Sequence, residues 1–186
     1  KQHEETAPSG TPISRNLKWL ILQLFHEGLT AKNLRSGMDR TETVTFEPWA
    51  EAKEAPITPD LHTVAFMLDS SYRLAPSLWG VQILLDTLQV CLKQPQMPRI
   101  LFVTTGAYSF QFAKNVDTPI NRGAAHGGVW GFSRVLRMEV PKFQTRCVEM
   151  DLTSLPDVRD SLIRDVTMFN DPEIGYMRSY RYWPRV

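Results

Sequence analysis

Short apolar segments alternate with segments of helical periodicity along most of this chain. Strands are predicted at Leu20 to Phe25, Thr43 to Glu47, Thr63 to Leu68, Arg99 to Thr105, Thr145 to Met150 and, as an extended segment, Glu173 to Val186. Helices are predicted at Thr30 to Gly37, Ser77 to Lys93, Ala124 to Val140 and Val158 to Phe169. Strands that alternate with helices favour an α/β fold with a parallel sheet and right-handed crossovers.

The distribution of apolar residues predicts how these elements are buried. The segment Thr63 to Leu68 is apolar on both faces, which is typical of a strand covered by helices on either side. One stripe of the helix from Ser77 to Lys93 contains Val81, Leu85, Leu88 and Leu92. Further apolar residues widen that stripe: Trp79, Ile83, Leu84 and Val90. A helix this apolar is expected to be buried against more than its own sheet.

The later helices are amphipathic. The inward face predicted for the helix from Ala124 to Val140 consists of Ala125, Val129, Phe132, Leu136 and Val140, and Pro141 marks the end of this helix. The inward residues predicted for the last helix are Val158, Leu162, Val166 and Phe169.

Length and composition favour one domain, from residue 16 to residue 186, because 186 residues are too few for two domains of typical size. Residues Lys1 to Arg15 are rich in Pro, Ser and Gly and poor in apolar residues, which predicts a linker or tail. The chain begins at Lys1 rather than Met, and it stops at Val186 directly after a strongly patterned segment. We therefore expect a piece of a longer polypeptide.

Charge and cysteine content exclude several function classes. A formal net charge of +1 gives no global field that would draw the chain to nucleic acid or to an anionic membrane. Cys91 and Cys147 lie in apolar stretches and predict buried free thiols in a reducing compartment, and the histidines share no metal-ligand spacing with them. No apolar run approaches the roughly 20 residues of a membrane span, and no signal peptide is visible, so we expect a cytoplasmic protein.

The segment after the first predicted strand lacks the features of a dinucleotide site. A single glycine, Gly28, follows Phe25, and Glu27 adds negative charge where phosphates would bind. No Tyr has the Lys four residues later with which short-chain reductases tune their catalytic Tyr. We therefore expect no catalytic, cofactor-binding or metal-binding residues. An atypical reductase site remains an alternative, with Tyr108 and Ser109 at a strand end and His126 nearby.

Two further patterns have a functional and a structural interpretation. The spacing of Gly106, Gly123, Gly127, Gly128 and Gly131 matches no phosphate-binding motif, so close packing of the helix is the interpretation that we favour. Near the end of the chain, basic and aromatic residues interleave: Arg178, Arg181 and Arg185 with Tyr176, Tyr180, Tyr182 and Trp183. Such a mix could bind an anionic partner or nucleic acid, and a strand pair with one buried face accounts for it equally well.

One string identifies a family resemblance. The segment Gly127 to Pro141 reads GGVWGFSRVLRMEVP, and it is preceded by PRILFVTTGA at Pro98 to Ala107. This combination resembles the structural subdomain of ketoreductases from modular polyketide synthases, which animal-type fatty acid synthases share. In that family a strand ending in TRGA is followed by a helix close to AAVWGLGRVLALEHP, a strand ending in VDL and a hairpin close to EVALRDGRRYVPRL. The counterparts here are Thr104 to Ala107, Gly127 to Pro141, Glu149 to Leu152 and Glu173 to Val186.

The resemblance covers about Leu17 to Val186 and implies a truncated Rossmann-like domain, similar to short-chain dehydrogenases/reductases, with a C-terminal β-hairpin. It implies that this half holds no NADPH and stabilises a catalytic, NADPH-dependent β-ketoacyl reductase half that begins after residue 186. That half would serve an acyl carrier protein among the other domains of the synthase. The two halves mimic a reductase dimer, joined through the helices near residues 77–93 and 124–140. The implied contact residues are Leu84, Leu88, Val129, Trp130, Phe132 and Arg134.

The sequence departs from the family pattern at two places. Arg178 and Ser179 replace the Asp-Gly of the hairpin turn, so a longer or looser hairpin is expected. The stretch from Gln111 to Gly123 also differs, and we expect a lineage-specific loop there.

Overall fold

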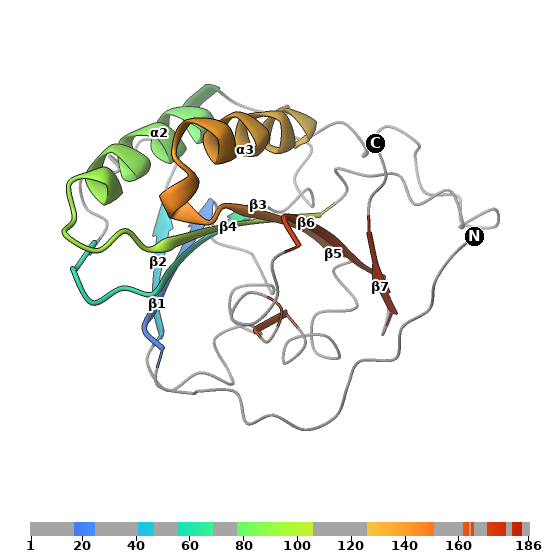
Figure 1. Cartoon of the computed structure of the whole chain (residues 1–186), viewed down its shortest axis with the longest axis horizontal. Helices are drawn as coiled ribbons and strands as arrows, with labels where there is room; N and C mark the ends of the chain where they lie inside the picture. The colour runs from blue at the N-terminus through green and yellow to red at the C-terminus, as the bar shows by residue number, and fades with distance from the viewer. Residues whose placement is uncertain are drawn as a thin grey trace.

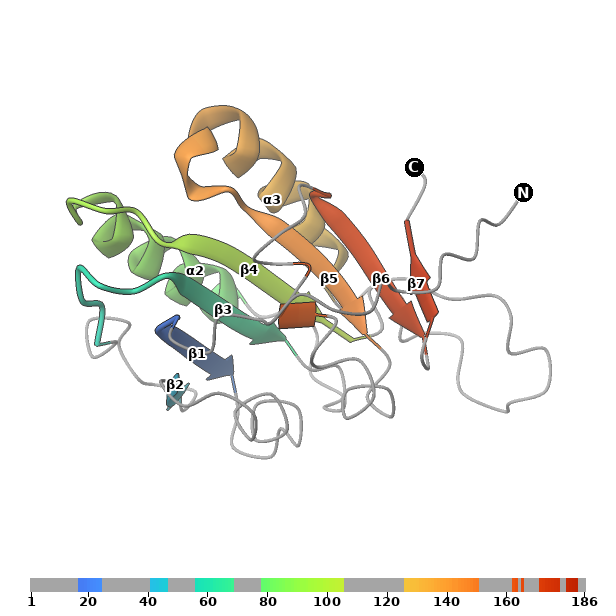
Figure 2. The same cartoon turned by 60° about the horizontal axis from the view of Figure 1, so that its bottom comes forward.

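The computed structural model describes residues 17–24, 41–46, 56–68, 78–105, 126–150, 162, 163, 165, 171–177 and 180–183. Within these residues, seven strands form one sheet in the order β2-β1-β3-β4-β5-β6-β7 (Figure 2). Neighbouring strands from β2 to β6 are parallel, and β7 is antiparallel to β6. The predicted α/β fold with a mostly parallel sheet is confirmed.

The strands are β1 (Trp19–Leu24), β2 (Thr41–Phe46), β3 (Thr63–Leu68), β4 (Arg99–Thr104), β5 (Arg146–Met150), β6 (Glu173–Met177) and β7 (Tyr180–Tyr182). The helices are α2 (Leu78–Leu92) and α3 (Gly127–Glu139), and the 3-10 turn η3 (Pro141–Phe143) follows α3. The strands and the two helices lie within or close to the segments predicted for them, whereas η3 was not predicted. The predicted tail from Lys1 to Arg15, the helix from Thr30 to Gly37 and the loop from Gln111 to Gly123 lie outside the described residues.

Both faces of the central strands are covered. Successive side chains of a strand point to opposite faces of the sheet. In β3, Val64 and Phe66 join a core cluster that includes residues of α2 and α3, whereas Ala65 and Met67 join a second cluster that includes Leu162. The prediction that this strand is buried on both sides is therefore confirmed.

Helices α2 and α3 lie on the same face of the sheet (Figure 1). The inward side of α2 contributes Ile83, Leu84, Leu88 and Cys91 to the core, and that of α3 contributes Val129, Trp130 and Leu136. Helix α3 ends before Pro141, as predicted, because a proline ring cannot continue the hydrogen-bonding pattern of the helix. Phe143 in η3 is fully buried and anchors the connection to β5.

The opposite face includes a helical segment at residues 162, 163 and 165. Leu162 is fully buried, as predicted for the inward side of that helix. The other residues predicted for its inward face, Val158, Val166 and Phe169, lie outside the described residues.

The C-terminal hairpin is tighter than expected. Strands β6 and β7 pair up to Met177 and Tyr180, which leaves two residues between the strands. The expectation of a longer or looser hairpin is therefore wrong. The strands stay paired without the usual glycine because β7 is fixed from the side: the Arg181 guanidinium binds Asp165 and Asp171 at 2.7 Å each. Arg178 and Ser179 themselves lie outside the described residues.

Candidate functional site

Large apolar side chains are exposed on both helices of one face. On α2 the exposed residues are Val81, Leu85 and Leu92, whose spacings of four and seven place them on one line of the helix. On α3 they are Val135, which is 49% exposed, and Met138, which is 72% exposed. We call these five residues the outer face. An exposed apolar patch of this kind is typical of a surface that binds another protein.

The glycines of α3 extend this surface. Gly128 and Gly131 precede Val135 by seven and four residues, so they lie on the same side of the helix as Val135, and both are exposed. A Cβ atom added at Gly127, Gly128 or Gly131 would meet nothing within 4 Å. The interpretation that close packing within the chain requires these three glycines is therefore wrong. Gly106 and Gly123 lie outside the described residues.

The six residues implied as partner contacts are distributed differently. Leu84, Leu88, Val129 and Trp130 are buried in the core of this chain. Phe132 is partly buried and meets the ring of Phe102 edge-on, with 6.2 Å between the ring centroids. Helices α2 and α3 place these five side chains toward the sheet, and the large apolar side chains that the two helices leave exposed are those of the outer face. The stripe predicted for α2 consists of Val81, Leu85, Leu88 and Leu92; Leu88 is buried and the other three are exposed, and Val135 and Met138 were not singled out.

Arg134, the sixth implied contact, fixes α3 to the sheet. Its guanidinium donates to both carboxylate oxygens of Glu173 in β6, at 2.8 and 2.9 Å. Arg137 donates to the same carboxylate at 2.6 Å and to the Ser133 hydroxyl at 2.9 Å. The hydrogen bond from Arg134 and, with it, that from Arg137 lower the pKa of Glu173 below its usual 4.5. This clamp orients α3 and hence two of the five residues of the outer face, Val135 and Met138.

A buried polar cluster lies at the carboxyl end of β4 and β5. The Trp130 indole donates to the Thr104 hydroxyl at 3.0 Å, and that hydroxyl is 2.5 Å from a carboxylate oxygen of Glu149. All three side chains are buried, so their polar atoms bond to one another instead of to water. The cluster fixes Trp130, and with it α3, above the sheet.

The alternative reductase site is only partly visible. Tyr108, Ser109, Glu27 and Gly28 lie outside the described residues. His126 occupies the N-cap position of α3 and makes no side-chain capping hydrogen bond.

The described basic and aromatic residues near the end of the chain are held by contacts within the fold. Tyr176 is buried, and its hydroxyl donates to the Asp165 carboxylate. Arg181 binds Asp165 and Asp171, and its guanidinium lies 4.7 Å from the Trp183 ring centroid. Burial and the Asp165 charge raise the pKa of Tyr176. These contacts fit the strand-pair interpretation of the segment, since they occupy Arg181 within the fold; Arg178 and Arg185 lie outside the described residues.

The cysteines are buried and free, as predicted. Burial raises the pKa of Cys91 and of Cys147 to about 12, so both thiols stay protonated at neutral pH and are poor nucleophiles. Among the described residues no group of His, Cys, Asp and Glu could hold a metal ion. Within the same ranges no helix has the length and apolar character needed to cross a membrane.

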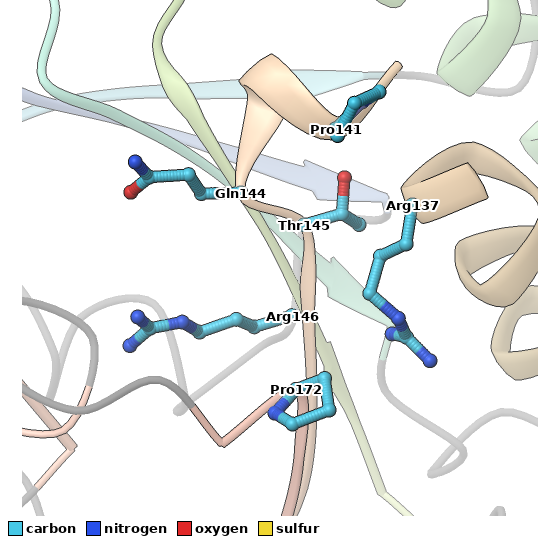
Figure 3. Close-up of a pocket in the computed structure, with 6 residues that line it drawn as sticks. All are labelled: Arg137, Pro141, Gln144, Thr145, Arg146 and Pro172. Atoms are coloured by element: carbon cyan, nitrogen blue, oxygen red, sulfur yellow. The ribbon is translucent and has the colours of Figure 1, made fainter. Parts of the chain in front are cut away.

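Two cavities open at the amino edge of the sheet. The smaller one, of about 300 Å³, lies where α3, η3, β5 and the residue before β6 meet (Figure 3). In Figure 3 the side chains of Gln144 and Arg146 point to one side of the backbone that enters β5, and that of Thr145 points to the other. Arg137 comes from α3 and lies on the same side as Thr145. The Thr145 hydroxyl is buried and has no hydrogen-bond partner among the described residues. The larger cavity, of about 410 Å³, lies beside β1, β3 and β4 and shares Gln144 as a lining residue.

The sequence matches no protein-family model, and no curated protein matches it significantly.

Proposed function

We propose that this chain is a noncatalytic, truncated Rossmann-like subdomain that packs against and stabilises the NADPH-dependent ketoreductase half of a cytoplasmic modular polyketide synthase. The observation that carries the proposal is the outer face of α2 and α3. Five large apolar side chains are exposed there, and the family resemblance places the contact between the two halves on these same helices. Burial of such side chains against a partner would remove their apolar surface from water.

The strand order supports the proposed architecture. The parallel order β2-β1-β3-β4-β5 is one of the two common orders of doubly wound sheets, in which the order reverses between β1 and β3. A cofactor of such a sheet binds at the carboxyl ends of the strands beside this reversal. Residues 26–31, which follow the first predicted strand, include Glu27 and one glycine, Gly28, which favours a subdomain without a cofactor.

In the proposed synthase the chemistry belongs to the partner half. That half would bind NADPH and reduce the β-keto group of an acyl chain held by the acyl carrier protein. The role of this chain would be mechanical: the Arg134–Glu173 clamp and the Trp130–Thr104 hydrogen bond hold α3, and α3 presents Val135 and Met138 to the reductase half.

The test uses the reductase half that the proposal places after Val186, produced as a separate polypeptide and titrated calorimetrically into this chain. We expect association, and we expect Val135→Glu to weaken it about tenfold or more, because burial of one Val contributes roughly 1.5 kcal/mol or more and a buried unpaired carboxylate adds a further cost. Val135→Leu is the matched control and should bind like the wild type.

Three results would contradict the proposal. The reading frame beyond Val186 could hold no reductase half, or the two polypeptides could fail to associate. The third is saturable binding of NADPH to this chain alone, which would contradict its noncatalytic role and favour the reductase alternative.

A further inference from the structure

The larger cavity at the amino edge is lined by basic residues from three neighbouring strand ends. Lys18 precedes β1, His62 precedes β3, and Arg99 begins β4. Backbone hydrogen bonds hold the three residues in place: the His62 amide donates to the Lys18 carbonyl at 2.9 Å, and the Arg99 amide donates to the His62 carbonyl at 2.8 Å. Groups positioned by the central strands of a sheet are held more rigidly than groups on loops.

A fourth element adds another cation and an amide. Lys142 lies in η3, and Gln144 follows this turn with a left-handed backbone, at φ 46° and ψ 46°. The turn is anchored by the fully buried Phe143 and by a hydrogen bond of 3.0 Å from the backbone N–H of Gln144 to the Pro141 carbonyl. Lys142 makes no ion pair with any residue that the structure describes.

The charges around the cavity do not cancel. Asp60 is the one carboxylate among the described residues that line it, against the three cations Lys18, Arg99 and Lys142. Asp60 is engaged locally, because it accepts hydrogen bonds from the Thr58 hydroxyl at 2.6 Å and from the Lys18 ammonium at 3.2 Å. The cavity therefore has an excess of positive charge, which favours an anion and disfavours a metal ion.

Neighbouring groups respond to this excess. Burial and the charge of Arg99 lower the pKa of His62, whose Nδ1 is 2.7 Å from the Thr63 hydroxyl. Burial and the same Arg99 charge lower the pKa of Arg146. An anion bound beside Arg99 would offset this repulsion and favour the protonated form of His62.

We propose that this cavity binds a small molecule through a phosphate group held by Arg99 and Lys142, with the Gln144 side-chain amide as a further donor and the Asp60-paired Lys18 beside it. Its volume of about 410 Å³ lies within the range of small-molecule sites, roughly 300–1,000 Å³. Guanidinium and ammonium groups are the usual donors to phosphate oxygens. Leu61 and Met97 supply an apolar wall, so the ligand carries an apolar portion next to its phosphate. The proposal does not depend on the function proposed above.

The test is calorimetric titration of phenyl phosphate, inorganic phosphate and benzoate into the whole chain, with the His62 pKa followed by NMR. We expect phenyl phosphate to bind most tightly and to raise the His62 pKa. Lys142→Met and Arg99→Met should each weaken its binding about tenfold or more, as expected for the loss of a charge-assisted hydrogen bond. The matched control is Lys93→Met, which removes one exposed cation outside the cavity and should leave binding unchanged.

The proposal is overturned if no saturable binding is seen up to about 10 mM phenyl phosphate, since this concentration is well above a dissociation constant of about 1 mM. It is also overturned by an equal loss in Lys93→Met, which would show an unspecific charge effect. Benzoate binding as tightly as phenyl phosphate would contradict the phosphate group, and inorganic phosphate binding equally well would contradict the apolar portion. Lys142 is exposed, so its substitution tests the site even if Arg99→Met fails to fold.

Discussion

Gln144 has the only positive φ among the described residues other than glycine. An L-residue in the left-handed region costs roughly 1–2 kcal/mol, because its Cβ approaches the following carbonyl oxygen. This backbone conformation lies where the chain turns from η3 into β5, between the buried Phe143 and the buried Thr145. Gln144 lines both cavities. Its strained backbone therefore places its side-chain amide at the amino edge of the sheet.

We predict that Gln144→Gly raises the free energy of unfolding by roughly 1 kcal/mol, because glycine adopts this backbone without a steric penalty. Urea denaturation of the whole chain measures the change. Gln96→Gly is the matched control, since Gln96 also lines the larger cavity and has no positive φ, and it should bring no gain. If Gln144→Gly left the free energy of unfolding unchanged or lowered it, the Gln144 side chain would stabilise the fold by at least as much as its left-handed backbone destabilises it.

At the scale of elements, Glu173 joins α3 to β6. Its side chain is only 12% exposed, and it accepts hydrogen bonds from two arginines of α3. Because the pKa of Glu173 is lowered in the folded protein, its stabilising contribution is fully present above the unfolded pKa, near 4.5. That contribution is lost as the pH falls through the lower pKa of the folded state.

We predict that Glu173→Gln lowers the free energy of unfolding by about 1–3 kcal/mol at about pH 7, since charge-assisted hydrogen bonds are lost and two guanidinium groups remain without their carboxylate. Denaturation of wild type and variant over a series of pH values measures the difference. It should shrink as the pH falls below the unfolded pKa, near 4.5, and through the lower pKa of the folded state, where the wild-type carboxylate becomes protonated. A difference that stays constant with pH would mean that the variant acts through packing instead of charge.

The sequence predicted the elements well where periodicity is a local property. Strand β3 was identified with the same bounds because its apolar run is short and continuous, and α2 was identified within a residue at either end. The hairpin turn was misjudged, because Arg178 and Ser179 are poor turn residues, whereas the pairing depends on Asp165 and Asp171 binding Arg181 from outside the hairpin. Such contacts between distant segments have no local sequence signal.

At the scale of the whole molecule, the sequence did not predict which apolar residues of α2 face outward, whereas Val129, Phe132, Leu136 and Val140 of the inward face predicted for α3 do contact the core. Leu84 and Leu88 are as apolar as Leu85, and only the sheet decides which of them it covers. The amino-edge cavity was missed for a related reason. Lys18, His62 and Arg99 are far apart in the sequence, and they meet because parallel strands begin at the same edge.

The glycine at position 131 offers a test of the outer face as a whole. Glycine inside a helix is less favourable than alanine by about 1 kcal/mol, and an added Cβ at Gly131 would meet nothing within 4 Å among the described residues. The described part of the fold therefore gives no reason for Gly131. A partner that packs closely on α3 would give one, because a glycine lets two backbones approach.

We predict that Gly131→Ala raises the free energy of unfolding of the free chain by roughly 0.5–1 kcal/mol and weakens its association with the reductase half. Denaturation measures the first effect, and titration of the separately produced half measures the second. The control, Gln82→Ala, changes an exposed residue of α2 away from the apolar line and should leave association unchanged. If Gly131→Ala strengthened both properties, close approach of a partner backbone at Gly131 would be excluded.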